Sequence, residues 1–179
     1  MGVLSRGPVN NTTHNRQSGT LRILGIDPGY ERCGFAVLDK HSRARETLVY
    51  SSCFKTPATL PFAERLVLIG RECARLMAEY TPTLCAIEKL YFTSNQKTAM
   101  QVAEVRGALL YLTRNAGLAL CEYTPNEVKV AVAGDGRADK QQITFMVPRL
   151  VSMPDQVRYD DEYDAIAVAL TASAHVRDS

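Results

Sequence analysis

Two short apolar runs in this sequence each end in an acidic residue. Residues 23–26 lead into Asp27, which is followed by Pro-Gly, and residues 85–87 lead into Glu88. Short apolar runs that turn signals bound are typical of buried strands. A carboxylate at the end of a buried strand is tolerated mainly when it is paired, hydrogen-bonded or coordinating a cation. The two runs therefore favour a sheet in which neighbouring strands bring their acids to one end.

The remaining sequence alternates between strand and helix signals. The expected strands are residues 21–26, 34–38, 47–54, 83–87 and 118–123, and the expected helices are residues 62–81, 95–115, 126–132, 140–151 and 160–176. Three strands first, and then helices alternating with two more strands, predict an α/β fold with a mixed five-stranded sheet flanked by helices. Strands ending at Asp27 and Ile87 should lie side by side.

Residues 1–20 are too polar and aperiodic to bury a face, so we expect a flexible N-terminal tail and one domain over residues 21–179. Arg6 and Arg16 would suit an arm that contacts DNA, although a passive extension is the simpler interpretation. A composition of 46% hydrophobic and 22% charged residues excludes a mostly disordered chain, and a net charge of +2 does not by itself demand nucleic acid.

The five cysteines are odd in number, widely spaced and without a CxxC pair. This pattern argues against a disulfide framework and against a zinc ribbon, and favours reduced thiols. No apolar run approaches the roughly 20 residues that span a bilayer, and the N-terminus lacks the apolar centre of a secretion signal. We therefore expect a soluble, cytoplasmic protein without a membrane partner.

The C-terminal helix supplies two more acids. Residues on a helix advance by about 100° each, so Asp161, Asp164, Val168 and Ala172 share one stripe, which we expect to point at the sheet. The other residues of this segment lie off the middle of the stripe: Asp160, Glu162 and Tyr163. The helix would therefore add Asp161 and Asp164 to the acids at the strand ends.

Four close carboxylates repel one another unless a cation compensates them. Mg²⁺ prefers oxygen ligands and bridges carboxylates to substrate phosphate. Two such ions about 4 Å apart can activate the attacking water and stabilise the leaving 3′ oxygen, which nicks a strand. Each acid also has an ordinary structural explanation: a turn residue for Asp27, a surface pair with Lys89 for Glu88, and a favourable helix dipole for the other two. Because three separate segments deliver acids to one predicted place, the conjunction favours a metal-dependent nuclease.

Four motifs of this sequence, at residues 23–29, 86–88, 103–107 and 161–167, resemble those of the bacterial RuvC Holliday junction resolvases. The resemblance runs in order from about residue 22 to 175. It implies a ribonuclease H-like fold and a homodimer that nicks four-way DNA junctions symmetrically with Mg²⁺ or Mn²⁺, two ions per active site. The implied role is homologous recombination and DNA repair, beside a branch-migration helicase of the RuvA and RuvB type.

The resemblance also implies roles for individual residues. Asp27, Glu88, Asp161 and Asp164 match its catalytic, metal-binding acids. Lys129 and Lys140 match basic residues near the cleft that would hold DNA phosphates, although either could be a solvated lysine at a helix start. Tyr91 or Phe92 matches an aromatic residue that could stack on unpaired bases at the junction, with a core position as the alternative for Phe92.

Three other functions compete with a junction resolvase. A RuvX-type protein shares the fold and the acids but is linked to RNA processing; the length and the Asp-x-x-Asp helix favour RuvC. Actin and hexokinase relatives need two such domains, and a non-catalytic DNA-binding module would not need intact acids. The apolar residues of helix 95–115 exceed one narrow stripe, so this helix faces either a second subunit, around residues 102–112, or the centre of one core.

Overall fold

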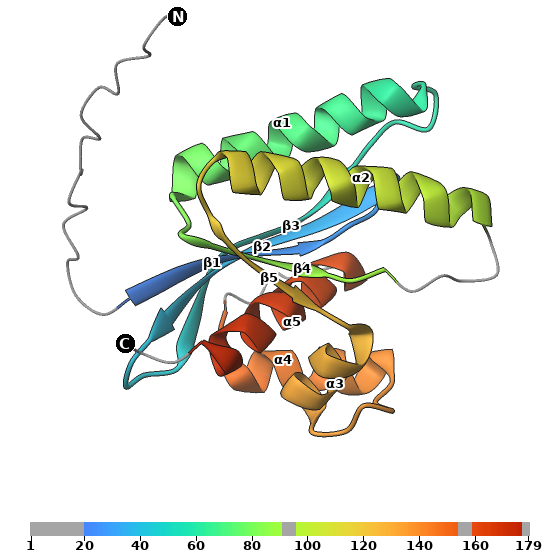
Figure 1. Ribbon diagram of the computed structural model, residues 1–179. Coiled ribbons are helices and arrows are strands. Elements are labelled where there is room, and N and C mark those ends of the chain that lie inside the picture. The colour runs from blue at the N-terminus through green and yellow to red at the C-terminus, as the bar shows by residue number, and fades with distance from the viewer. Residues whose placement is uncertain (1–19, 91–95, 154–158, 177–179) are drawn as a thin grey trace, which may run out of the picture.

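A mixed sheet with helices on both faces forms the framework of the protein, seen in a computed structural model that describes residues 20–90, 96–153 and 159–176 (Figure 1). Residues 1–19 of the predicted flexible tail, residues 1–20, lie outside this range, and Thr20 is the first residue of β1. The elements in chain order are β1 (Thr20–Asp27), β2 (Arg32–His41), β3 (Glu46–Lys55), α1 (Phe62–Tyr80), β4 (Leu84–Glu88), α2 (Gln96–Asn115), β5 (Ala119–Tyr123), α3 (Pro125–Ala133), α4 (Lys140–Leu150), β6 (Val151–Ser152) and α5 (Asp160–His175).

The sheet order is β5-β4-β1-β2-β3-β6 among the described residues. β1, β2 and β3 form an antiparallel meander, whereas β4 runs parallel to β1, and β5 parallel to β4. In the pairing of β1 with β4, Ile26 lies opposite Ile87. The expectation that these strands are neighbours is therefore confirmed, and their C-terminal residues Asp27 and Glu88 reach the same end of the sheet.

The predicted α/β class is confirmed, but the strand number of five is wrong because the described sheet has a sixth strand. β6 has two residues, paired in parallel with the start of β3, with Val151 opposite Glu46. A two-residue strand is too short to show the alternation that identifies a strand in sequence. Val151 is buried in the core instead of closing the preceding helix, which ends at Leu150.

Two hydrophobic cores lie on opposite faces of the sheet. α1 and α2 cover one face, and α5, with α3 and α4 outside it, covers the other (Figure 1). Side chains alternate across each strand, so within β1 Ile23 packs toward α5 and Leu24 toward α1. α5 is sandwiched between the sheet and α3 and α4, and its residues 165–170 are all buried.

Two glycines bring α5 directly onto the sheet. A Cβ atom on Gly25 would lie 2.3 Å from the Ala165 carbonyl oxygen, and one on Gly34 would lie 2.0 Å from the Asp161 carbonyl oxygen. Any side chain at either position would push α5 away from β1 and β2. The glycines therefore set the height at which the N-terminal turn of α5 lies above the strand ends.

α2 has both a core side and an outward side. Val105, Leu109 and Thr113 are buried against the sheet and α1, while Met100 and Tyr111 are 64% and 69% exposed. The core interpretation of this helix is thus correct for one side, and the other leaves large apolar groups at the surface. None of the helices in the described ranges is long and apolar enough to cross a membrane.

Candidate active site

The strand ends and the start of α5 bring the predicted acids to one place. Asp27 ends β1, Glu88 ends β4, and Asp164 lies one turn into α5. These three acids, together with Lys129 and Lys140, line a cleft of about 270 Å³ between the sheet end, α3, α4 and α5. Three of the four predicted acids therefore line one cleft, together with Asp139, the N-cap residue of α4, which was not predicted from the sequence.

Burial and mutual repulsion perturb these carboxyls strongly. Loss of solvent, followed by the charges of Asp164, Glu88 and Asp161, raises the pKa of Asp27 to about 8. Loss of solvent and the charge of Asp164 raise the pKa of Glu88 to about 7, against the opposing effect of Lys129. Burial also raises the pKa of Asp164 despite its hydrogen bond from Lys140. The site concentrates negative charge that the protein alone compensates only in part.

The donor set fits a divalent cation, although the acids do not form a finished coordination shell. Among the described residues, no three acidic, cysteine or histidine side chains already converge as metal ligands. The acids that face the cleft nevertheless offer carboxylate oxygens, which hard cations such as Mg²⁺ and Mn²⁺ prefer. The raised pKa values of Asp27 and Glu88 mark a place where an added positive charge would be strongly favoured.

Asp161 lies beside the cleft, where residues of β2 and β3 hold its carboxylate. Its carboxylate accepts a hydrogen bond from the Cys53 thiol, with Sγ 3.3 Å from Oδ2, and forms an ion pair of 3.5 Å with Arg32. Asp160, by contrast, is exposed and lies 3.5 Å from the Lys140 ammonium. The structure thus separates the two neighbouring acids as helical phase predicts, with Asp161 toward the sheet and Asp160 toward solvent.

Two capped helices position the basic side of the cleft. Thr124 and Asp139 cap α3 and α4, and each forms a reciprocal capping box with the residue three positions later. The α4 cap places Lys140 at the first helical position, where its ammonium lies 3.0 Å from Asp164. Lys129 lines the same cleft from α3. Both predicted lysines therefore flank the acids.

Sequence reasoning missed two contacts that hold the acid-bearing elements. Glu162 is 7% exposed and accepts a 2.7 Å hydrogen bond from the Ser51 hydroxyl, so β3 contacts the first turn of α5 at Ser51 as well as at Cys53. Arg106 of α2 donates a 2.9 Å hydrogen bond to the carbonyl of Glu88 and pairs with Glu122. Side chains alternate along β3, so Ser51 and Cys53 lie on one face of the strand. This alternation is the sequence pattern that could have predicted their shared contact with α5.

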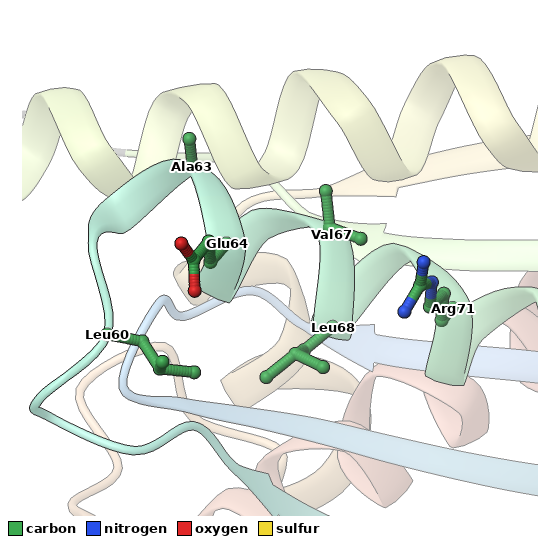
Figure 2. A pocket seen from close by; sticks show the side chains of 6 residues that line it. All are labelled: Leu60, Ala63, Glu64, Val67, Leu68 and Arg71. Atoms are coloured by element: carbon green, nitrogen blue, oxygen red, sulfur yellow. The ribbon is translucent and has the colours of Figure 1, made fainter.

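Tyr91 and Phe92 lie outside the described residues, so their stacking role remains a prediction from sequence. A second hollow lies at the start of α1, on the face of the sheet away from α5 (Figure 2). Its lining is mostly aliphatic, with Glu64 and Arg71 as the charged side chains. One acid and one base at the surface do not form a metal site, so the chemistry points to the cleft at the strand ends.

Comparison with known proteins identifies the family. The family model described as crossover junction endodeoxyribonuclease RuvC matches residues 23–172, most of the chain. The chain belongs to the RuvC family. A crossover junction endodeoxyribonuclease RuvC of Leifsonia xyli subsp. xyli is 40% identical over 151 residues, which cover 84% of this chain and 73% of the relative. As a RuvC-family protein, the chain is an endonuclease that hydrolyses phosphodiester bonds.

Solved RuvC structures share the fold. Thermus thermophilus RuvC in complex with Holliday junction substrate matches with a TM-score of 0.78 and 29% identity, covering 84% of this chain and 92% of that chain. The yeast mitochondrial Holliday junction resolvase Ydc2 matches with a TM-score of 0.67 and 13% identity, covering 87% of this chain and 78% of that chain. The second likeness concerns the fold alone. The ribonuclease H-like class expected from the sequence is confirmed.

Proposed function

We propose that this chain resolves four-way DNA junctions by paired, symmetric nicks during homologous recombination and DNA repair in the cytoplasm. The observation that carries the proposal is the convergence of Asp27, Glu88 and Asp164 on one cleft, with Asp161 beside it, in a RuvC-family fold. A relative of this fold has been solved with a Holliday junction bound, which supports the same substrate here. A branch-migration helicase of the RuvA and RuvB type is the proposed partner.

Asp27, Glu88, Asp161 and Asp164 are the proposed ligands of two divalent ions, Mg²⁺ or Mn²⁺. When bound, such ions supply Lewis acidity and a water nucleophile at neutral pH. The side chains of the protein contribute the negative charge that gathers the ions, and the rigid strand ends fix two of the carboxylates. The Cys53 and Arg32 contacts hold Asp161 in place before the substrate arrives.

A substrate comparison with Mg²⁺ tests the proposal. A labelled four-way junction, a linear duplex of the same sequence and an RNA duplex would be offered to the purified protein. We expect nicks at symmetric positions in the junction, weak cleavage of the linear duplex and none of the RNA. Preferential RNA cleavage would favour a RuvX-type activity, and binding without cleavage would favour a non-catalytic module.

The lysines of the cleft provide a separate prediction. Lys129→Ala and Lys140→Ala should each weaken junction binding and flatten its salt dependence, because each lost phosphate contact removes about 0.9 from the slope of log K against log salt. Lys140 contacts Asp164 in the free protein, so its ammonium would exchange a carboxylate partner for a phosphate partner. Fluorescence anisotropy over a range of salt concentrations measures both effects, and unchanged slopes would reject the phosphate role.

The outward side of α2 predicts a homodimer. A four-way junction offers two equivalent strands, and two-fold symmetry would place one site on each. Met100, Ala103, Gly107 and Tyr111 form an exposed stripe in which two small residues permit close helix approach. We expect a dimer at micromolar concentration by light scattering and a monomer for Tyr111→Glu.

Phe145→Glu is the matched control, since Phe145 is also a large exposed apolar residue, 59% exposed, on α4. This variant should remain dimeric. A wild-type monomer with full junction cleavage would contradict the predicted dimer.

A further inference from the structure

Two cations face each other across β2 and β3 at the end of the sheet that carries the acids. Arg32, the first residue of β2, pairs directly with Lys55, the last residue of β3. Arg32 reaches Asp161, and Lys55 follows Cys53 by two residues on the same face of β3. Directly opposed like charges are unfavourable in a sheet, and the Asp161 carboxylate beside Arg32 compensates this pair only in part.

The two cations are held differently. Arg32, with its side chain 54% exposed, lies 3.5 Å from the Asp161 carboxylate. Lys55 is exposed, and its ammonium lies 3.9 Å from the centroid of the Tyr159 ring, the residue that precedes α5. Within the described part of the chain, no carboxylate forms a salt bridge with Lys55. An aromatic ring orients the ammonium without neutralising it, so its positive charge remains available.

The sheet order places this pair on the opposite flank of the acids from Lys129. Lys129 lies near Glu88, the end of β4, whereas Arg32 and Lys55 belong to β2 and β3. Asp27, at the end of β1, lies between them because β1 separates β4 from β2. A strand of DNA drawn across this end of the sheet would meet Lys129, then the acids, then Arg32 and Lys55.

We propose that Arg32, Lys55 and Tyr159 form a second phosphate-binding site for the DNA strand being cut, across the scissile phosphate from Lys129. Arg32 and Lys55 supply the charge, and Tyr159 is a positioning residue for the Lys55 ammonium. Because the acids lie between the two basic flanks, binding on both sides would hold the scissile phosphate over them. This proposal deepens the proposed function and rests on it.

Salt-dependent binding of a four-way junction, measured without divalent metal so that no strand is cut, tests the charge. Lys55→Gln should weaken binding and reduce the salt slope by about 0.9, the value for one phosphate contact. Arg43→Gln is the matched control, because Arg43 is an exposed cation in the β2–β3 turn at the other end of the sheet. Its slope should equal that of the wild type. An unchanged slope for Lys55→Gln would overturn the proposal.

The role of Tyr159 is tested by conservative rescue. Tyr159→Phe keeps a ring beneath the ammonium and should bind like the wild type. Tyr159→Leu should weaken binding in the wild-type background and have no further effect in the Lys55→Gln background. Equal weakening by Tyr159→Leu in both backgrounds would show that the ring does not act through Lys55.

The position of the site is tested with junctions in which single phosphates beside the cleavage point carry neutral methylphosphonates. A methylphosphonate at the phosphate that Lys55 contacts should weaken binding by the wild type but not binding by Lys55→Gln. A methylphosphonate at the phosphate that Lys129 contacts should weaken binding by the wild type but not binding by Lys129→Ala. The two phosphates should lie on opposite sides of the cleavage point. If Lys55 and Lys129 both contact phosphates on the same side of the cleavage point, the proposed path of the DNA strand is wrong. A wild-type protein that neither binds nor cuts junctions would instead refute the proposed function, so the two failures are distinguishable.

Discussion

Asp27→Asn is expected to lower the junction-nicking rate by about a thousandfold or more, because a metal-stabilised transition state loses several kcal/mol when a ligand loses its charge. Glu88→Gln, Asp161→Asn and Asp164→Asn should have comparable effects. Junction binding should persist in all four variants, since the proposed phosphate contacts come from other side chains. Single-turnover cleavage with Mg²⁺, measured beside binding without metal, separates the two steps.

Asp160→Asn is the matched control for these four variants. Asp160 is adjacent to Asp161 in sequence, but its side chain is 67% exposed and pairs with Lys140 rather than facing the sheet. We expect nicking within a few-fold of the wild type. An inactive Asp160→Asn together with an active Asp161→Asn would show that the assignment of these two acids is reversed.

The metal-free protein should become more stable when Asp27 is replaced by asparagine at alkaline pH. The pKa of Asp27 is raised from 3.8 to about 8 in the folded state, so the folded state binds its proton more tightly than the unfolded state does. Stability contributed by this group is therefore present below about pH 4 and lost as pH rises toward 8. At 1.36 kcal/mol per pKa unit, the cost at pH 9 is on the order of several kcal/mol.

Thermal unfolding in a metal chelator checks this prediction. At pH 9, Asp27→Asn should melt on the order of 10 °C above the wild type, given roughly 2–4 °C per kcal/mol for a chain of this size. At pH 4 the difference should be small, because Asp27 is then protonated in the folded wild type and the unfolded chain is only partly ionised at this position. Mg²⁺ should raise the wild-type melting temperature at pH 9 more than that of the variant. Equal pH profiles for the two proteins would contradict the electrostatic account of the site.

The sequence carried enough information to place the acids because each follows a strong local signal. Asp27 and Glu88 follow apolar strands, and helical phase separates Asp161 from Asp160. Such periodic patterns depend only on which face of an element is buried. The side-by-side placement of β1 and β4 then followed from fold class, and the structure agrees with it.

Features that depend on tertiary contacts could not be predicted from sequence patterns. Glu162, which helical phase placed away from the acids, is buried, and it accepts a hydrogen bond from Ser51 on a strand more than a hundred residues earlier. The opposition of Arg32 and Lys55 depends on strand register, including a bulge between Val37 and Leu38. β6 is a two-residue strand that pairs with the start of β3, a contact that no local pattern in the sequence indicates.

The central claim is that four carboxylates at the strand ends and on α5 cut four-way junctions with a divalent metal. Its most direct measurement is cleavage of a labelled four-way junction by the wild type and by Asp27→Asn, each with Mg²⁺ and with a chelator. We predict symmetric nicks only for the wild type with Mg²⁺. Nicking by Asp27→Asn at the wild-type rate, or nicking by the wild type in the chelator, would contradict the account.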